Sequence, residues 1–309
     1  MRTLYFLISV LVFTVISCHS PKRETEKFPP EMVSFKPYEN NPVFSGTKSD
    51  TWDDKIRERG YILHEEGIFK MWYSGYNGGS EDPKYLGYAT STDGINWSRH
   101  SNNPVFDAKW TEDMFVIKDD GTYYMFAEGE NDVAHFLTSP DGINWTEQGD
   151  LTIITTRGDT LSAPYGTPVI WIENGQWYLF YERNDDAIWL AKSDDKLTWT
   201  NVQDEPVLRP GPDEYDFGAV AANQIIKYKD RYYMYYHGNA IPLGVKTEKR
   251  SIWTSNVAVS EDLINWEKYP GNPIVEGDHS SPILVYYRDQ YLLYTMHDIV
   301  WLYFPGETE

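Results

Sequence analysis

One seven-residue phrase occurs four times in this chain and constrains the fold more than any other feature. The copies are STDGINW from residue 91, SPDGINW from 139, SDDKLTW from 193 and SEDLINW from 260. Their tryptophans, at positions 97, 145, 199 and 266, are 48, 54 and 67 residues apart. A phrase that returns at such intervals indicates that one supersecondary unit is repeated along the chain.

The residues before each phrase follow the same order in every unit. A short apolar segment is followed by a polar turn, then by a segment rich in Tyr, Trp, Phe and Met, and then by a third apolar segment. The turns contain Glu66-Gly67, Asp120-Gly121, Asn174-Gly175, Asp230 and Asp289. Asp-Gly and Asn-Gly accept positive φ, so they are typical of tight β-hairpins. Each unit is therefore predicted to form antiparallel strands, with the phrase closing the turn before a short fourth strand.

A fifth unit, SPILVYYRDQYLLYTMHDIVWLYF, lacks the phrase. Five units of about 50 residues with four strands each predict an all-β fold, a five-bladed β-propeller over residues 36–309. We expect each tryptophan of the phrase to pack between neighbouring blades, which makes the phrase architectural rather than catalytic. Because an open ring would leave unpaired sheet edges, we expect residues 300–304 and 42–44 to close it.

The N-terminus has the pattern of an export signal. Arg2 is followed by an apolar run from Leu4 to Ile16, which is too short to span a bilayer comfortably. The run ends at Cys18, the only cysteine, in a context that resembles a bacterial lipobox. We therefore expect residues 1–18 to be a lipoprotein signal peptide, Cys18 to be lipidated, and residues 19–35 to be a tether. The protein would then be anchored in the outer membrane, on its periplasmic or outer side; the alternative is a plain secretory signal.

The overall charge narrows the choice of partners. The formal net charge is -20, which argues against nucleic acid as a partner because nucleic-acid binders usually present a basic face. The chain contains 12 Trp and 24 Tyr, enough to supply aromatic surfaces on which sugars stack. The seven histidines do not have the spacing of zinc ligands. We expect a monomer that binds carbohydrate.

In a propeller the first strand of each blade lines the axis, so functional residues are expected just before those strands and after the second strands. Carboxylates that converge there raise one another's pKa, which allows one to hold a proton while another stays ionised. Glycosidic cleavage needs such a pair. The candidate catalytic residues are Asp54, Glu112, Asp113, Glu182 and Asp216. The candidate substrate-binding residues are Arg57, Glu58, Arg59, Trp110, Arg183, His237 and His279. The arginines could bind an acidic sugar or could simply pair with nearby acids.

FKMWYSG at residues 69–75, followed by GYATSTDGINW at 87–97, resembles the five-bladed propeller glycoside hydrolases. These are glycoside hydrolase family 43 and its arabinanase, levansucrase and invertase relatives, with the mannoside phosphorylases nearby. The resemblance implies an inverting hydrolase of α-L-arabinofuranosides or β-xylosides that needs no cofactor, although a structural Ca²⁺ in the channel is a habit of the family.

The resemblance also implies an acid on each of the first three blades. The blade-one carboxylate falls among Asp53, Asp54 and Glu58, and Glu112-Asp113 matches on blade two. Blade three has Gly166-Thr167-Pro168 where the general acid is expected, so Asp159, Glu182 or Asp216 would have to replace it.

Three functions remain open from the sequence. The first is a glycosidase that degrades a plant or algal polysaccharide. The second is a glycan-binding lipoprotein without catalysis, which the missing blade-three acid would favour. The third is another carbohydrate-active enzyme, either a phosphorylase or a sialidase-like hydrolase, since the phrase is similar to the sialidase Asp box.

Overall fold

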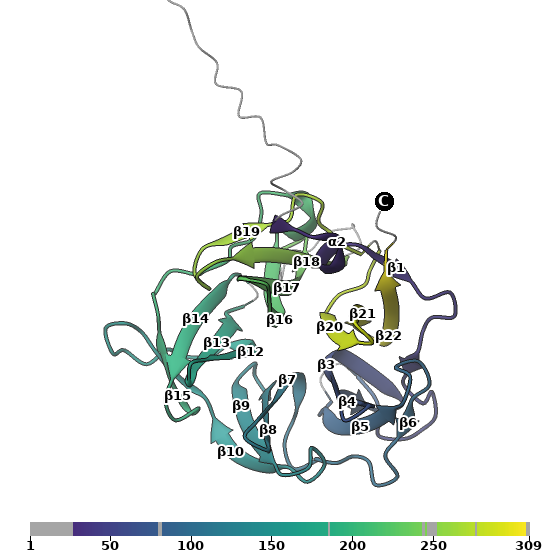
Figure 1. Ribbon diagram of the computed structural model, residues 1–309. Coiled ribbons are helices and arrows are strands. Elements are labelled where there is room, and N and C mark those ends of the chain that lie inside the picture. The colour runs from purple at the N-terminus through teal and green to yellow at the C-terminus, as the bar shows by residue number, and fades with distance from the viewer. Residues whose placement is uncertain are drawn as a thin grey trace, which may run out of the picture.

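The computed structural model describes residues 27–79, 82–184, 186–242, 245, 252–275 and 277–306. Within these ranges it contains five sheets arranged as blades around a central axis (Figure 1), which confirms the predicted five-bladed propeller. Cys18 and residues 19–26 of the predicted tether lie outside the described residues. No helix in the described ranges has the length and apolar character needed to cross a membrane.

Each of the first four blades follows chain order from the axis outward. Blade one contains β3 (Lys55–Glu65), β4 (Ile68–Tyr76), β5 (Tyr85–Ser91) and β6 (Ser98–Arg99). Blade two contains β7 (Glu112–Asp119), β8 (Thr122–Glu128), β9 (Ala134–Ser139) and β10 (Thr146–Asp150). Blade three contains β12 (Gly166–Glu173), β13 (Gln176–Glu182), β14 (Ile188–Ser193) and β15 (Thr198–Asn201), with β11 (Thr152–Ile154) parallel to β15. Blade four contains β16 (Ala219–Tyr228), β17 (Arg231–Asn239), β18 (Trp253–Ser260) and β19 (Trp266–Lys268), preceded by η1 (Glu214–Asp216).

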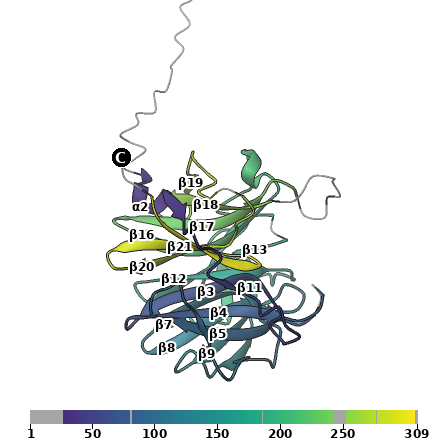
Figure 2. The same cartoon turned by 90° about the vertical axis from the view of Figure 1, so that its right-hand side faces the viewer.

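Blade five joins the two ends of the described chain. β20 (Pro282–Tyr287), β21 (Gln290–Met296) and β22 (Ile299–Pro305) are completed by β1 (Phe35–Pro37) as the outer strand. β2 (Phe44–Ser45) also pairs with β22, with Phe44 opposite Val300, so both segments expected to close the ring do take part. Figures 1 and 2 show β1 and the short helix α2 (Pro30–Val33) beside the C-terminal strands.

The hairpin turns have the predicted conformation. Glu66 and Gly67 both have positive φ, at 54° and 78°, and Asp120-Gly121 and Asn174-Gly175 repeat that pair. Two consecutive residues with positive φ give the turn whose twist matches that of antiparallel strands. These turns therefore fix the register between the first and second strands of the blades.

The repeated phrase forms a capped turn between the third and fourth strands. In the first copy, the Oδ1 of Asp93 accepts the backbone N–H groups of Ile95 (2.9 Å) and Asn96 (2.8 Å), and Ser91 Oγ accepts that of Gly94. Asp141 and Asp262 make the same bonds, which lower the pKa of each carboxyl to about 2 even though burial opposes the shift. These aspartates are committed to the backbone, so the phrase is structural, as predicted.

The tryptophan of each phrase packs on the second strand of the preceding blade, as expected. Ring centroids are 6.3 Å apart for Trp145 and Trp72, 5.8 Å for Trp199 and Phe126, and 5.9 Å for Trp266 and Phe180. Trp97 closes the circle by packing 6.4 Å from Tyr294 of blade five. Aromatic pairs of this kind contribute about 0.5–1.5 kcal/mol each beyond the area they bury.

A hydrogen bond accompanies this packing at several of the joints. Trp72 Nε1 donates to the Gly142 carbonyl (2.7 Å), and the Tyr294 hydroxyl donates to the Gly94 carbonyl (3.0 Å). Blade five lacks the phrase, and there the Tyr235 hydroxyl donates to the carbonyl of Met32 in α2 (2.8 Å). The N-terminal segment therefore supplies the part of the joint that the fifth unit lacks.

This finding corrects the predicted domain boundary. Phe28 and Met32 belong to the expected tether, yet they are only 3% and 0% exposed. They belong to a core cluster that they form with residues of blades four and five. The composition of residues 19–35 is polar overall, which concealed two apolar anchors. The folded domain begins by residue 27 rather than at residue 36.

Replacing Met32 with alanine tests the joint. Removing a fully buried methionine leaves a cavity, so we expect the free energy of unfolding to fall by about 2–5 kcal/mol in urea titrations. Glu39→Ala, at an exposed position in the following loop, is the matched control and should change it by less than about 0.5 kcal/mol. Equal behaviour of the two variants would show that residues 27–34 act only as a linker.

Candidate active site

The first strands of blades one, two and three each contain a β-bulge near their N-terminal ends. The pairing register shifts between Arg57 and Tyr61 in β3, between Glu112 and Phe115 in β7, and between Gly166 and Val169 in β12. Within the bulges, Arg59, Asp113 and Thr167 adopt φ values of 51°, 49° and 44°. Left-handed backbone at residues other than glycine is strained and is common at functional sites, where bulges redirect side chains.

Four carboxylates come from the strand ends next to these bulges. Glu112 begins β7 and lies directly opposite Glu128, the last residue of β8. Glu182 ends β13 in the corresponding place and lies opposite Gly166. Asp113 follows Glu112 in the bulge. We call Glu112, Asp113, Glu128 and Glu182 the acidic cluster.

Gly166 is the position where two members of the cluster converge. Its N–H donates to Glu182 Oε1 (3.0 Å), and the next N–H, of Thr167, donates to Glu128 Oε2 (2.9 Å). A Cβ at Gly166 would lie 2.0 Å from that Glu128 oxygen and 2.8 Å from the Glu182 oxygen. Blade three therefore lacks an acid at this position because the acids of two second strands occupy the space that a side chain would need.

The environment of Glu128 favours its protonated form. Burial raises the pKa of the Glu128 carboxyl well above its ordinary value, and the negative charges of Asp113, Glu182, Glu112 and Asp132 raise it further. A carboxyl in such surroundings retains a proton at pH values where its neighbours are ionised.

Glu112 has the opposite environment. Arg57 Nε lies 2.7 Å from one of its oxygens, and the Trp110 indole N–H donates to the other at 2.7 Å. The guanidinium and the N–H dipole both compensate a negative charge on Glu112. The site therefore places a carboxyl group with a raised pKa opposite a carboxyl group that contacts a guanidinium and an indole N–H, on facing positions of one hairpin.

The remaining substrate-binding candidates, apart from Glu58, have contacts outside this cluster. Arg59 is 1% exposed, and its guanidinium donates to the Pro168 carbonyl (3.3 Å), which ties blade one to blade three. Arg183 follows Glu182 in the chain and lies 5.4 Å from the ring of Trp189. His237 is buried in β17 with its ring 5.1 Å from that of Trp253. Glu58 lies in β3, and its side chain is outside the described part of the structure.

Asp216 is a structural residue rather than a candidate acid. It is fully buried, is paired with Lys268, and accepts a hydrogen bond from the Tyr236 hydroxyl (3.0 Å). Asp53 of blade one repeats this arrangement with Tyr73 (3.0 Å) and Arg99 (2.9 Å). Each acid forms an ion pair with a cation on the fourth strand of its own blade. Because that partner is distant in the sequence, the local pattern around Asp216 suggested a catalytic acid instead.

Two further candidates line separate depressions. Asp54 lines a cavity of about 500 Å³ with Lys48, Lys55, Tyr76 and Asp298, at the junction of blades five and one. His279 lines a cavity of about 390 Å³ with Phe35, Trp301 and Tyr303, and burial lowers the pKa of its imidazole. Neither depression is lined by a member of the acidic cluster.

Glu128 was not among the candidate residues predicted from the sequence. Glu128 and Glu182 both end second strands, in MFAEGE and LFYERN, and this shared position could have pointed to it. No group of three or more His, Cys, Asp or Glu side chains in the described ranges is arranged to hold a metal ion, and the structural Ca²⁺ stays a prediction.

Comparison with known proteins supports the fold and points to glycan chemistry. No protein-family model matches the chain. The 1,2-beta-oligomannan phosphorylase of Thermoanaerobacter sp. (strain X514) is 26% identical over 265 residues, which cover 77% of this chain and 86% of the relative. A solved glycosyl hydrolase from Bacteroides ovatus has a TM-score of 0.66 at 17% identity and covers 87% of this chain and 92% of its own.

A second solved structure comes from work on the GH130 family of mannoside phosphorylases, described as containing glycoside hydrolases that target beta-1,2 mannosidic linkages in Candida mannan. It has a TM-score of 0.65 at 16% identity and covers 89% of this chain and 95% of its own. The chain thus has the five-bladed propeller fold of glycoside hydrolases, and the relative reported above is named as an oligomannan phosphorylase rather than as an enzyme for the xylosides or arabinofuranosides that the sequence suggested.

The raised pKa of Glu128 predicts how stability depends on pH. Above the ordinary glutamate value of 4.5 the unfolded state loses this proton while the folded state keeps it, so stability falls as pH rises toward the folded-state pKa. Glu128→Gln removes that loss. We therefore expect its melting temperature to exceed that of the wild type by a margin that grows as the pH rises above 4.5. Glu130→Gln, an exposed neighbour, should show a constant difference, and the same constant difference for Glu128→Gln would contradict the raised pKa.

Proposed function

We infer that this protein is a carbohydrate-active enzyme that hydrolyses the glycosidic bond of a neutral mannoside, with β-1,2-linked mannosides as the first substrates to test. The observation that carries the proposal is the acidic cluster, in which buried Glu128 faces Glu112 across one hairpin and lies beside Asp113 and Glu182. The name of the oligomannan phosphorylase relative supports the choice of sugar.

The geometry supports distinct roles for the carboxyl groups. Glu128 holds the proton that is transferred to the leaving oxygen, because burial and four nearby acids keep it protonated. Asp113, half-buried in the bulge beside it, is the ionised partner that activates water on the other side of the sugar. Glu112 is fixed by Arg57 and Trp110 and stabilises positive charge on the sugar in the transition state. Glu182 acts through its charge, which raises the pKa of Glu128.

Phosphorolysis is the second candidate, favoured by the phosphorylase relative and by Arg57 and Arg59 near the cluster. A phosphate dianion would have to enter among four carboxyl groups, while Arg57 is already paired with Glu112. This charge balance favours water as the attacking group.

The products decide between the two reactions. Incubation with β-1,2-mannobiose should release mannose at the same rate with and without phosphate, as measured by ion-exchange chromatography. Mannose 1-phosphate formed in a phosphate-dependent reaction would establish the phosphorylase instead. If no mannoside, xyloside or arabinofuranoside is cleaved while mannan still binds, the protein is a glycan-binding module.

The assigned roles predict a dependence on the leaving group. Glu128→Gln and Asp113→Asn should each lower kcat on mannobiose by about 10²–10⁴-fold. The dinitrophenolate group of a dinitrophenyl mannoside leaves without being protonated. This substrate should therefore restore the activity of Glu128→Gln but not that of Asp113→Asn. Asp54→Asn, in the separate depression, should retain wild-type activity.

The activity of the wild type should fall as the pH rises through the pKa of Glu128, and this alkaline limb of the pH–rate profile should disappear in Glu128→Gln. A profile that is unchanged in the variant would show that another group is the acid.

The predicted attachment to the outer membrane through Cys18 remains part of the proposal. It would place the enzyme where it meets extracellular oligosaccharides. A Cys18→Ala variant that remains with the membrane fraction after cell lysis would contradict lipid anchoring.

A further inference from the structure

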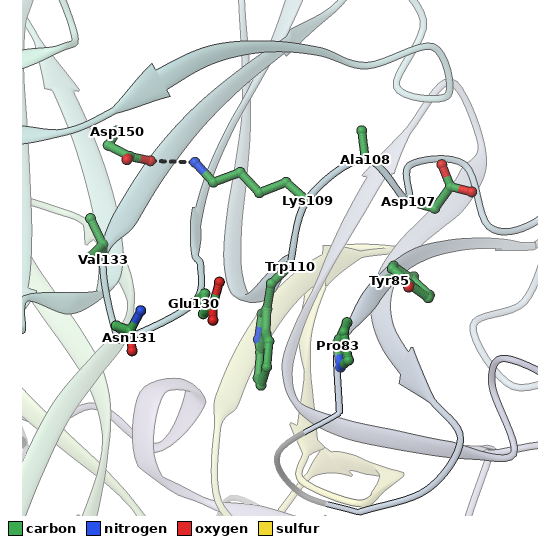
Figure 3. A pocket seen from close by; sticks show the side chains of 10 residues that line it. All are labelled: Pro83, Tyr85, Asp107, Ala108, Lys109, Trp110, Glu130, Asn131, Val133 and Asp150. Atoms are coloured by element: carbon green, nitrogen blue, oxygen red, sulfur yellow. Dashed lines mark hydrogen bonds and ion pairs between the residues drawn. The ribbon is translucent and has the colours of Figure 1, made fainter.

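A cavity of about 620 Å³ lies between blades one and two (Figure 3), and its lining residue Trp110 is hydrogen-bonded to Glu112 of the acidic cluster. Its size is within the range of small-molecule sites. Four separate segments line it, namely the start of β5, the connection between the two blades, the loop from β8 to β9, and the end of β10. The residues that line it include Asp107, Ala108, Lys109, Trp110, Asn131 and Asp150.

Trp110 connects this cavity to the proposed catalytic residues. Its indole N–H donates to Glu112 (2.7 Å), while its ring forms part of the cavity wall. The buried ammonium of Lys84 lies 4.1 Å from the centre of the same ring and holds it in place by a cation–π contact. A ligand in the cavity therefore touches a residue that is bonded directly to the acidic cluster.

The walls are fixed before any ligand binds. Lys109 is held by ion pairs to Asp150 and to Glu147 (3.1 Å), and Glu147 is bound in turn by buried His135 (2.8 Å). The opposite loop is anchored where Tyr165 N–H donates to the Asp132 carbonyl (2.9 Å). A preformed cavity loses little entropy when it binds a ligand.

The charges of the lining define the class of ligand. Among the described residues that line the cavity, Asp107, Glu130 and Asp150 contribute negative charge, and the single cation, Lys109, is already paired with acids. An anionic ligand such as a uronic or sulfated sugar would be repelled. Carboxylates, the amide of Asn131 and the Trp110 ring instead suit a neutral sugar, whose hydroxyls donate hydrogen bonds and whose apolar face stacks on an aromatic ring.

We propose that the cavity between blades one and two is a binding site for further sugar units of a neutral oligosaccharide whose scissile bond lies at the acidic cluster. The proposal rests on the proposed function for the position of that bond. It makes the enzyme selective for chains longer than a disaccharide, because contacts with distant units accelerate the reaction at the scissile bond.

Filling the cavity tests the proposal by kinetics. Ala108 is exposed on the cavity wall, so Ala108→Arg obstructs the cavity without disturbing the core. We expect kcat/KM to fall by about tenfold or more for β-1,2-mannotetraose and to change by less than about twofold for mannobiose. Asn102→Arg adds the same charge at an exposed position outside the cavity and should leave both values unchanged. Equal losses for the two substrates would overturn the proposal.

Binding to a variant that cannot turn over separates this proposal from the proposed function. Calorimetric titration of Asp113→Asn with mannotetraose should give tighter binding than mannobiose, and Asn131→Gly in that background should weaken only the tetraose. Glycine is chosen because Asn131 has a φ of 62°, which alanine would adopt only with strain. Selective tetraose binding without cleavage by the wild type would reject the enzymatic function alone. Cleavage without selective binding, or equal binding of an oligogalacturonide, would reject the cavity proposal alone.

Discussion

The joint between neighbouring blades is the interaction on which the rest of the structure depends. The tryptophan of each phrase packs on an aromatic residue of the second strand of the preceding blade, as Trp145 does on Trp72, and at two of these joints the turn's carbonyl also accepts a hydrogen bond from that residue. This contact fixes both the distance and the rotation between the two sheets. Where the phrase is absent, Met32 provides the carbonyl that receives Tyr235. Because the ring is closed by the same contact that joins its other blades, the strand ends at its centre are held in defined positions.

The positions that the fold gives to its acids shift their pKa values in opposite directions. Asp141 in the phrase accepts several backbone N–H groups, and its pKa is about 2. Glu128 accepts one N–H but is buried among other carboxyl groups, so its pKa rises. The difference comes from the number of donors and the charge of the neighbours, since both are ordinary carboxyl groups. The fold thus uses one set of acids for architecture and places another where a proton can be held and transferred.

The fold was predictable because its signals are local. The phrase, the Asp-Gly turns and the alternating strands each depend on residues close together in sequence, and together they specified five blades. The site was only partly predictable. Glu112 and Asp113 of the acidic cluster were among the predicted candidates, but the raised pKa of Glu128 and its hydrogen bond depend on Glu182 and Thr167, which come from another blade. Asp216 had the same local context as a catalytic acid, and only Lys268, 52 residues away, shows that it is structural. Phe28 and Met32 were assigned to the tether because a short polar stretch does not reveal which apolar residues find a surface to pack on.

Charge around the cluster explains how one scaffold can serve either hydrolysis or phosphorolysis. Both reactions need a proton donor for the leaving oxygen, and in the proposed mechanism Glu128, whose pKa is raised, has that role in either case. They differ in the attacking group, since phosphate requires unpaired cations whereas water requires a carboxylate. Here Arg57 is paired with Glu112, and Arg59 donates to a backbone carbonyl. The cations near the cluster therefore contact the protein's own acids and carbonyls, and in the proposed reaction the half-buried Asp113 is the group that takes a proton from water.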